Sequence, residues 1–257
     1  MAKRRLKPKY RKILNILVII FTIICLMFAI YSIIKIINWK KDVEKNDKIQ
    51  DNIEDNITIV EPTNEEQEVK YNIDFEQLKE INKDTIAYLK VNGTNIDYVI
   101  VKGKDNSYYL KHNFNKEYNS AGWIFADYKN NFDESDKNII IYGHNTKDGS
   151  MFGTLKNILD KNWQKNQENL EIILVTENGQ YKYKVFSTYS IVPEDYYIST
   201  EFKNDDEFND FIKKLKSRSI YDYDIKVSGE DKILTLSSCI GDGKKRVVLH
   251  AKLIKVN

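Results

Sequence analysis

Cys239 and Arg246 are two residues near the C-terminus whose chemistry could combine at one site. They flank a short polar loop, residues 240–245, between two apolar runs that we predict to be paired strands, Lys232 to Ser238 and Arg246 to Ile254. Such a hairpin brings the end of its first strand beside the start of its second. A guanidinium beside a thiol favours the thiolate and can bind a developing oxyanion. A lone Cys after an apolar strand is also commonly a small buried residue, so a purely structural role is the alternative.

A cysteine nucleophile works with a partner acid or base, and three histidines could serve. His144 ends a predicted buried strand, residues 138–145, and precedes a polar loop, where functional residues concentrate. His112 lies in a tyrosine-rich turn that favours packing or exposure over catalysis. His250 alternates with core residues of the last predicted strand, and we predict that it faces outward. His144 is therefore the candidate partner of Cys239.

The net charge of the chain is +2, but it is distributed unevenly. The first 12 residues carry seven bases and no acid, which leaves −5 on the remainder and argues against a nucleic-acid surface. Of the two cysteines, Cys25 lies in an apolar run, so we expect no disulfide with Cys239. The sequence has no CxxC pair and no His/Cys cluster, and we expect neither a metal nor a cofactor.

Residues 13–34 are almost entirely apolar, and a helix of that length spans about 33 Å, which matches a bilayer core. A cleaved signal peptide is disfavoured because the run is too long and no small-residue cleavage site follows it. We predict a basic cytoplasmic tail over residues 1–12 and a transmembrane anchor over 13–37. The excess of bases before the anchor predicts an N-terminus in the cytosol and the rest of the chain outside the cell.

Residues 38–71 are expected to form an acidic, solvated stalk outside the membrane. The part from Asp42 to Glu68 holds ten acids, two lysines and little apolar periodicity. From residue 72 to 257 the chain has the pattern of a single globular domain. Ile73 to Ile81 predicts a short helix capped by Asp74, and Asp205 to Ser219 predicts a longer amphipathic helix.

The predicted strands of this domain are short, numerous and separated by turns. Besides those already given, they cover residues 86–91, 96–101, 122–127, 170–176 and 180–192, and residues 150–163 are expected to be helical. The count is about eight strands with few helices. That pattern favours a closed antiparallel or mixed barrel over a doubly wound sheet.

The motifs TLSSC (Thr235 to Cys239) and YGHN (Tyr142 to Asn145), with Arg246 at the head of the next strand, resemble those of the sortases. These are membrane-anchored cysteine transpeptidases of Gram-positive bacteria. The family motif TLxTC occurs here with Ser238 in place of the second Thr. The long segment from Pro193 to Asp224, with its helix between the sixth and seventh strands, resembles class B members in particular.

The resemblance implies a mainly β fold, an eight-stranded sortase barrel with N-terminal helices and a long helix between strands 6 and 7. It implies Cys239 as nucleophile, His144 as general acid/base and Arg246 as the group that stabilises the oxyanion and substrate. It also maps a substrate-binding serine onto Ser237. The activity implied is cleavage of a C-terminal sorting signal after Thr, followed by transfer through a thioacyl intermediate to an amine of cell-wall peptidoglycan.

The partners implied are secreted proteins that carry the sorting signal, a peptidoglycan precursor or cross-bridge amine, and the membrane through the N-terminal helix. Two alternatives stay open on the sequence. One is another extracellular cysteine acyltransferase or thiol peptidase, although papain-like peptidases place the Cys early and the His late. The other is a non-catalytic wall-binding barrel, in which Cys239 would be inert.

Overall fold

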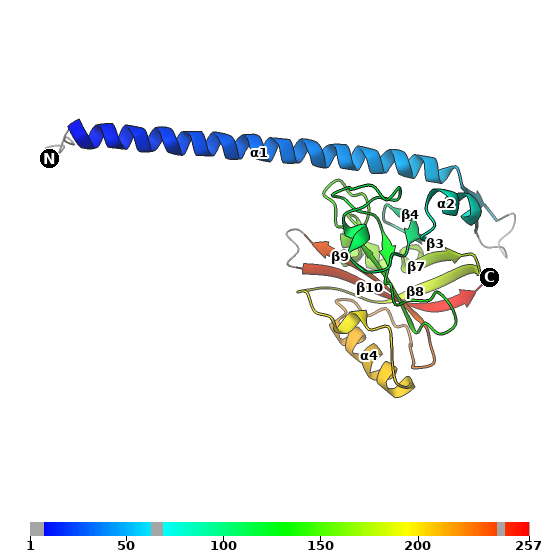
Figure 1. Ribbon diagram of the computed structural model, residues 1–257. Coiled ribbons are helices and arrows are strands. Elements are labelled where there is room, and N and C mark those ends of the chain that lie inside the picture. The colour runs from blue at the N-terminus through cyan, green and yellow to red at the C-terminus, as the bar shows by residue number, and fades with distance from the viewer. Residues whose placement is uncertain (1–7, 63–68, 241–244, 257) are drawn as a thin grey trace. The chain divides into compact units, whose positions relative to one another are not determined.

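A computed structural model describes residues 8–62, 69–240 and 245–256, without the side chains of Cys239 and Ile240 (Figure 1). The chain divides into two compact units, Met1–Glu44 and Lys45–Asn257. The first unit holds most of one continuous helix, α1 (Pro8–Glu54). Its apolar side chains are exposed over residues 13–37, as lipid-facing side chains are. Within the described residues, this is the one helix long and apolar enough to cross a membrane.

The second unit is built on a closed eight-stranded barrel, as predicted (Figure 1). The strands close in the order β10-β8-β7-β3-β4-β5-β6-β9. Their bounds are β3 (Thr85–Val91), β4 (Ile96–Val101), β5 (Phe125–Ala126), β6 (Asn138–Gly143), β7 (Glu171–Thr176), β8 (Gly179–Ile191), β9 (Ile233–Ile240) and β10 (Lys245–Val256). The barrel is mixed, because β4 with β5 and β6 with β9 are parallel pairs.

Alternation along the strands separates the inside of the barrel from its outer face. On β9, Leu234 and Leu236 point into the main apolar core, and Leu249 of β10 joins them there. Thr235 and Ser237 alternate with the two leucines along β9 and therefore face outward. The β-branched and apolar runs of the sequence form strands because one face of each is buried in this way.

The longest helix of the second unit is α4 (Asp205–Arg218), which connects β8 to β9 and covers the outer face of the barrel (Figure 1). Asn204 caps it by accepting a hydrogen bond from the backbone N–H of Glu207. Its buried face is Phe208, Ile212 and Leu215. This helix confirms the predicted one between strands 6 and 7. The short helix α2 (Phe75–Ile81) is capped by Asp74 as predicted.

The remaining helical segments are short. They are η1 (Tyr108–Leu110), η2 (Leu155–Leu159), α3 (Lys161–Lys165), η3 (Gln167–Leu170) and η4 (Tyr196–Ile198). The helix expected over 150–163 is therefore mostly one 3₁₀ segment and the start of α3. The strand expected over 122–127 is confined to the two residues of β5, and Gly122 has a positive φ of 61°, outside the range of a regular strand.

The structure differs from the solvated stalk that we expected over residues 38–71. Ile49 and Ile53, at the end of α1, are buried in the main core. Asn46 is also buried and donates to the carbonyl of Gly122 at 3.0 Å, while Asn119 donates to Asn46 at 2.8 Å. Side chains four residues apart lie on one helix face, so a sparse apolar pair was enough to dock this segment.

A small hairpin follows that docked segment, and the sequence did not predict it. β1 (Ile57–Val60) pairs antiparallel with β2 (Lys70–Ile73) outside the barrel. The backbone of Tyr71 donates to the side chain of Gln180 on β8 at 3.0 Å, which ties the hairpin to the barrel. Its strands are mostly exposed, so they lack the apolar alternation by which a strand is usually recognised.

Candidate active site

The strand register brings the three predicted catalytic residues together. Arg246 on β10 is the Cα partner of Cys239 on β9. In the parallel pair β6·β9, Gly143 is the partner of Ser238, so the next residues, His144 and Cys239, are neighbours at the same end. Residues 144, 239 and 246 therefore occupy one rung across β6, β9 and β10. The placement of Cys239 rests on the backbone alone.

The imidazole of His144 is oriented by a backbone carbonyl. His144 is half-buried, and its Nε2–H donates to the carbonyl oxygen of Leu110 at 2.8 Å. This bond leaves Nδ1 with the lone pair when the ring is neutral. The glycine before His144 is required by packing, because a Cβ at Gly143 would lie 2.6 Å from the ring of Phe152.

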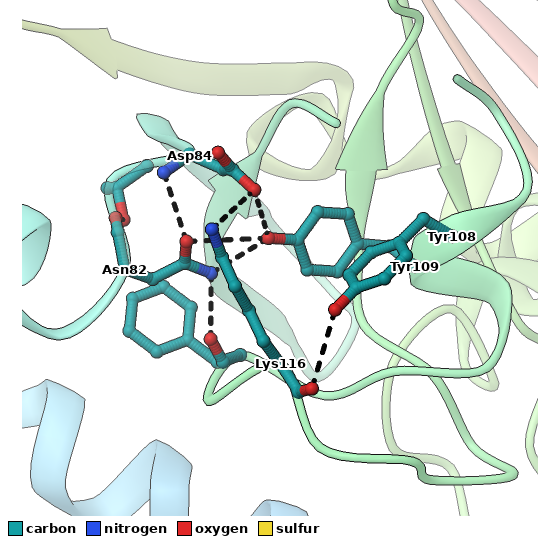
Figure 2. A network of polar contacts seen from close by, with 7 residues as sticks. Asn82, Asp84, Tyr108, Tyr109 and Lys116 are labelled. Atoms are coloured by element: carbon teal, nitrogen blue, oxygen red, sulfur yellow. Dashed lines mark hydrogen bonds and ion pairs between the residues drawn. The ribbon is translucent and has the colours of Figure 1, made fainter. Parts of the chain in front are cut away.

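A partly buried polar network holds the segment that carries the Leu110 carbonyl (Figure 2). The hydroxyl of Tyr109, the preceding residue, donates to Asp84 at 2.7 Å and lies 2.9 Å from the Asn82 amide nitrogen. Lys116 forms an ion pair with the same Asp84 carboxylate at 2.9 Å. Burial raises the pKa of the Tyr109 hydroxyl, so the tyrosine remains a neutral donor.

Gly122 packs against the other side of this segment. A Cβ at Gly122 would lie 2.4 Å from the carbonyl oxygen of Tyr109, and the N–H of Trp123 donates to that same oxygen at 2.9 Å. Only glycine fits at this approach, with its positive φ. The Leu110 carbonyl is thus held from both sides, and His144 with it.

Arg246 enters β10 between two strands. Its Cα partners are Cys239 on β9 and Ile191 on β8, and its side chain is half-buried. A guanidinium there can bind an anion that forms at the end of β9. Asp242, in the polar loop between the two strands, lies outside the described residues.

The comparisons with known proteins identify the family of this chain. The family model for the sortase domain matches residues 89–254. A sortase B of Listeria monocytogenes is 41% identical over 186 residues, which cover 70% of this chain and 74% of the relative. This chain belongs to the sortase family. It is a class B sortase, and its activity is that of a cysteine transpeptidase.

Solved sortase B structures have the same fold as this sortase. The Bacillus anthracis enzyme in complex with a compound named AAEK1 gives a TM-score of 0.72 at 35% identity and covers 84% of this chain and 99% of its own. The Staphylococcus aureus sortase B–substrate complex gives 0.67 at 35% identity, with 71% of this chain and 85% of its own covered. N-terminal membrane anchoring is consistent with the apolar part of α1.

Ser237 of the sortase is buried beneath η4. Its side chain lies on the outer face of β9, and its Oγ is 3.0 Å from the hydroxyl of Tyr197. Only 4% of Ser237 is exposed. Tyr142, its Cα partner on β6, donates its hydroxyl to Asp127 at 2.8 Å. These contacts place polar groups beside the end of β9 that carries Cys239.

Three features around this site were not predicted from the sequence. The Leu110 carbonyl leaves no side-chain signal, because it is a backbone acceptor. Tyr197 has only one signal in the sequence, its place in a Tyr-Tyr pair after Pro193. His250 lies on the outward face of its strand, as predicted, yet η4 and its neighbours bury it completely.

Among the described residues, no three His, Cys, Asp or Glu side chains group together as metal ligands would. His112 stacks on Tyr108 with ring centroids 3.9 Å apart, in the tyrosine-rich turn where we expected packing or exposure.

Proposed function

We propose that Cys239 is the nucleophile of this sortase, His144 its general acid/base, and Arg246 the group that stabilises the oxyanion and substrate. The observation that supports this is the shared rung of residues 144, 239 and 246 across β6, β9 and β10. A thiol, an imidazole and a guanidinium at one strand end are the groups that thioacyl transfer requires.

In the first half-reaction, the thiol proton of Cys239 passes to Nδ1 of His144, and the thiolate attacks the carbonyl carbon of the Thr in a sorting signal. The carbonyl oxygen becomes an oxyanion, and the Arg246 guanidinium neutralises it. The C–N bond then breaks, and His144 gives its proton to the departing amine. Because Nε2–H of His144 donates to Leu110, we assign this proton to Nδ1.

In the second half-reaction, an acceptor amine attacks the thioester. His144 removes the proton from that amine, an amide bond forms, and the sulfur leaves again as the thiolate. The two half-reactions pass through similar tetrahedral oxyanions, so one arginine can serve both.

The substrates proposed follow from relatives. One solved relative is a sortase B–substrate complex from Staphylococcus aureus, and another is a sortase B complexed with triglycine. For this chain we propose secreted proteins with a C-terminal sorting signal as acyl donors. The proposed acceptor is an amine of a peptidoglycan precursor or cross-bridge. We further propose that Ser237 contributes to substrate binding, through its place two residues before Cys239.

The proposed location is the cell membrane, with one crossing. Residues 1–12 would form the cytoplasmic tail, 13–37 the anchor, and 72–257 the extracellular catalytic domain. Seven bases before the apolar run support a cytosolic N-terminus. An anchored enzyme meets exported substrates and wall precursors at raised effective concentration.

The test uses the full chain in detergent micelles. The protein is incubated with fluorogenic pentapeptides of the LPxTG, NPxTN and SPxTG types, and intact-mass spectrometry measures any acyl adduct. We expect an adduct with one peptide type, absent in Cys239→Ala and released by an added amine. An adduct that persists in Cys239→Ala would remove this cysteine from the mechanism.

A further inference from the structure

A line of buried polar side chains runs beneath the connection between β8 and β9. Three of its hydrogen bonds lie among residues that are nearly all buried. The hydroxyl of Tyr196 in η4 donates to the hydroxyl of Tyr189 on β8 at 3.2 Å. That second hydroxyl lies 2.9 Å from Nε2 of His250 on β10. Nδ1 of His250 lies 2.8 Å from Oγ1 of Thr235 on β9.

The line continues to β6 and returns to the connection where it began. Thr235 donates to the side-chain oxygen of Asn138 at 2.7 Å, and the amide nitrogen of Asn138 donates to the carbonyl of Ser199 at 2.9 Å. Ser199 follows η4 directly. The line therefore joins η4 to four strands, β8, β10, β9 and β6, three of which carry the catalytic rung.

The donors along this line are ordered in one direction. Thr235 has a single hydroxyl proton and gives it to Asn138, so it must accept from Nδ1–H of His250. Tyr189 accepts from Tyr196 and donates its own proton to Nε2. Each polar atom is satisfied only while His250 is neutral and in the Nδ1–H tautomer.

His250 is the central member of the line. It is 0% exposed, and burial lowers its pKa from 6.5 to about 3, which keeps the ring neutral. Its ring also meets that of Tyr197 edge-on, with centroids 6.5 Å apart. The Tyr197 hydroxyl lies 3.0 Å from Oγ of Ser237, two residues before Cys239.

We propose that His250 is a positioning residue, which holds η4 against the outer face of β9 so that the acyl-donor peptide binds in register with Cys239. The inference rests on the proposed acyl transfer at Cys239. It adds a residue outside the catalytic rung whose contribution acts through Tyr197 and Ser237. The contribution is expected in peptide binding, whereas the reactivity of the thiol is unaffected.

Two variants break the line at the same bond. Tyr189→Phe removes one hydroxyl and keeps the ring. His250→Asn keeps an N–H for Thr235 but is too short to reach Tyr189. Both are made in the full chain in detergent. Should His250→Asn fail to fold, Tyr189→Phe carries the test.

Ser187→Ala is the matched control. Ser187 is the Cα partner of His250 on β8, it is 0% exposed, and its hydroxyl donates to the carbonyl of Leu215 in α4 at 2.8 Å. This hydrogen bond therefore holds α4, and not η4, against β8 within the same β8–β9 connection. We expect the loss of the Ser187 hydroxyl to weaken the packing of α4 on β8 and to leave η4 in place.

Three quantities are measured on each protein. Hydrogen–deuterium exchange reports the order of residues 194–199 and, separately, of residues 208–216. Steady-state kinetics with the acylating pentapeptide give KM and kcat. The rate of iodoacetamide alkylation at Cys239, followed by peptide mass spectrometry, reports thiol reactivity without a peptide substrate.

We expect both line-breaking variants to lose protection at residues 194–199 and to raise KM by about fivefold, the effect of one net hydrogen bond. Alkylation of Cys239 stays within about twofold of the parent, because thiolate reactivity depends on its local charges rather than on η4. Ser187→Ala leaves KM and the exchange of 194–199 unchanged.

Unchanged exchange at 194–199 in both variants, or a rise of KM equal to that of Ser187→Ala, overturns the inference and leaves His250 as core packing. Failure of the proposed function gives a different result. In that case Cys239→Ala remains active or no peptide acylates the parent, and the exchange measurement still decides whether His250 holds η4.

Discussion

The imidazole of His144 gains its orientation from a carbonyl on a distant loop. Since Nε2–H is committed to Leu110, Nδ1 is the nitrogen that can exchange a proton with the reactants. The side chain therefore has one nitrogen for proton exchange and one fixed nitrogen, as histidines in catalytic pairs commonly do.

This assignment can be observed directly. In protein with ¹⁵N-labelled histidine, the long-range ¹H–¹⁵N spectrum of neutral His144 is expected to show the Nε2–H tautomer. His250 is expected to show the opposite tautomer, Nδ1–H, which gives an internal contrast. A neutral His144 with its proton on Nδ1 would contradict the proposed direction of proton transfer.

Arg246→Lys tests the second proposed role at this scale. A guanidinium offers a planar fork of donors to an oxyanion, and an ammonium on a flexible stem cannot reproduce it. We expect kcat/KM to fall at least about a hundredfold, the loss typical of one oxyanion donor. Steady-state kinetics measure this, and near-normal turnover by the lysine variant would show that charge alone suffices.

The buried His250 makes the stability of the barrel pH-dependent. Its pKa is about 3 in the folded protein and 6.5 ordinarily, so the unfolded chain binds more protons between these values. The free energy of unfolding therefore falls as pH drops through this window, by about 2 kcal/mol at pH 5. Lys214 and Arg218 of α4, near the Tyr196 ring, add positive charge on the same side.

Urea unfolding of the parent and of His250→Asn at pH 5 and pH 7.5 measures this contribution. The parent is expected to lose about 2 kcal/mol that the variant does not, because asparagine cannot be protonated in that range. Equal pH slopes in the two proteins would show that His250 titrates normally.

At the scale of elements, the segment from η1 to β5 positions a side chain of the proposed active site. It is held by Asn82 and Asp84 on one side (Figure 2). On the other side Gly122 approaches it closely. Its Leu110 carbonyl accepts the hydrogen bond that orients the His144 ring. The position of the proposed catalytic imidazole thus depends on a segment in which we propose no catalytic side chain.

Gly122→Ala should disturb this segment. A Cβ there lies 2.4 Å from the Tyr109 carbonyl oxygen at a φ of 61°. We expect a loss of about 1–2 kcal/mol in unfolding free energy from the backbone strain. We also expect kcat/KM to fall about tenfold or more as Leu110 shifts away from His144.

Gly179→Ala is the control for that strain. Gly179 also has a positive φ, 146°, but it is the first residue of β8, directly after the turn from β7. It should lower stability and leave kcat/KM unchanged. Urea unfolding and peptide kinetics on both variants give the comparison, and equal kinetic losses would show that the effect is not transmitted through Leu110.

At the scale of the whole molecule, the end of α1 is part of the catalytic unit. The division of the chain falls between residues 44 and 45, and the segment after it docks Ile49 and Ile53 in the barrel core. Asn46 bonds to the backbone of Gly122. The segment beyond the proposed anchor therefore contributes to the fold as well as linking it to the membrane.

Two truncated proteins test this contribution. One begins at Trp39 and keeps residues 45–54, and the other begins at Asp55 and lacks them. Since each buried isoleucine contributes about 1.5–3 kcal/mol, the two together set an upper bound of about 3–6 kcal/mol, which the cost of ordering the helix reduces. We expect the shorter protein to be the less stable of the two. Urea unfolding measures the difference, and equal stabilities would show that the docked helix adds nothing.

The local patterns of the sequence determined much of this protein. Alternating apolar runs predicted the strands, an amphipathic period with its polar start predicted α4, and the 22-residue apolar run at 13–34 predicted a membrane helix. Apolar periodicity depends only on residues close together in the sequence, so it predicts helices and strands before the tertiary structure is known. The hairpin between β9 and β10 also brought residues 239 and 246 together from sequence alone.

Only the tertiary structure decided what meets across long separations. The parallel pairing of β6 with β9 puts His144 beside position 239, and no local pattern encodes which strands pair. The Leu110 carbonyl, the burial of His250 under η4 and the docking of Ile49 and Ile53 depend on the same long-range closure. A side chain's surroundings are set by segments distant in the chain, and those contacts form only when the barrel closes.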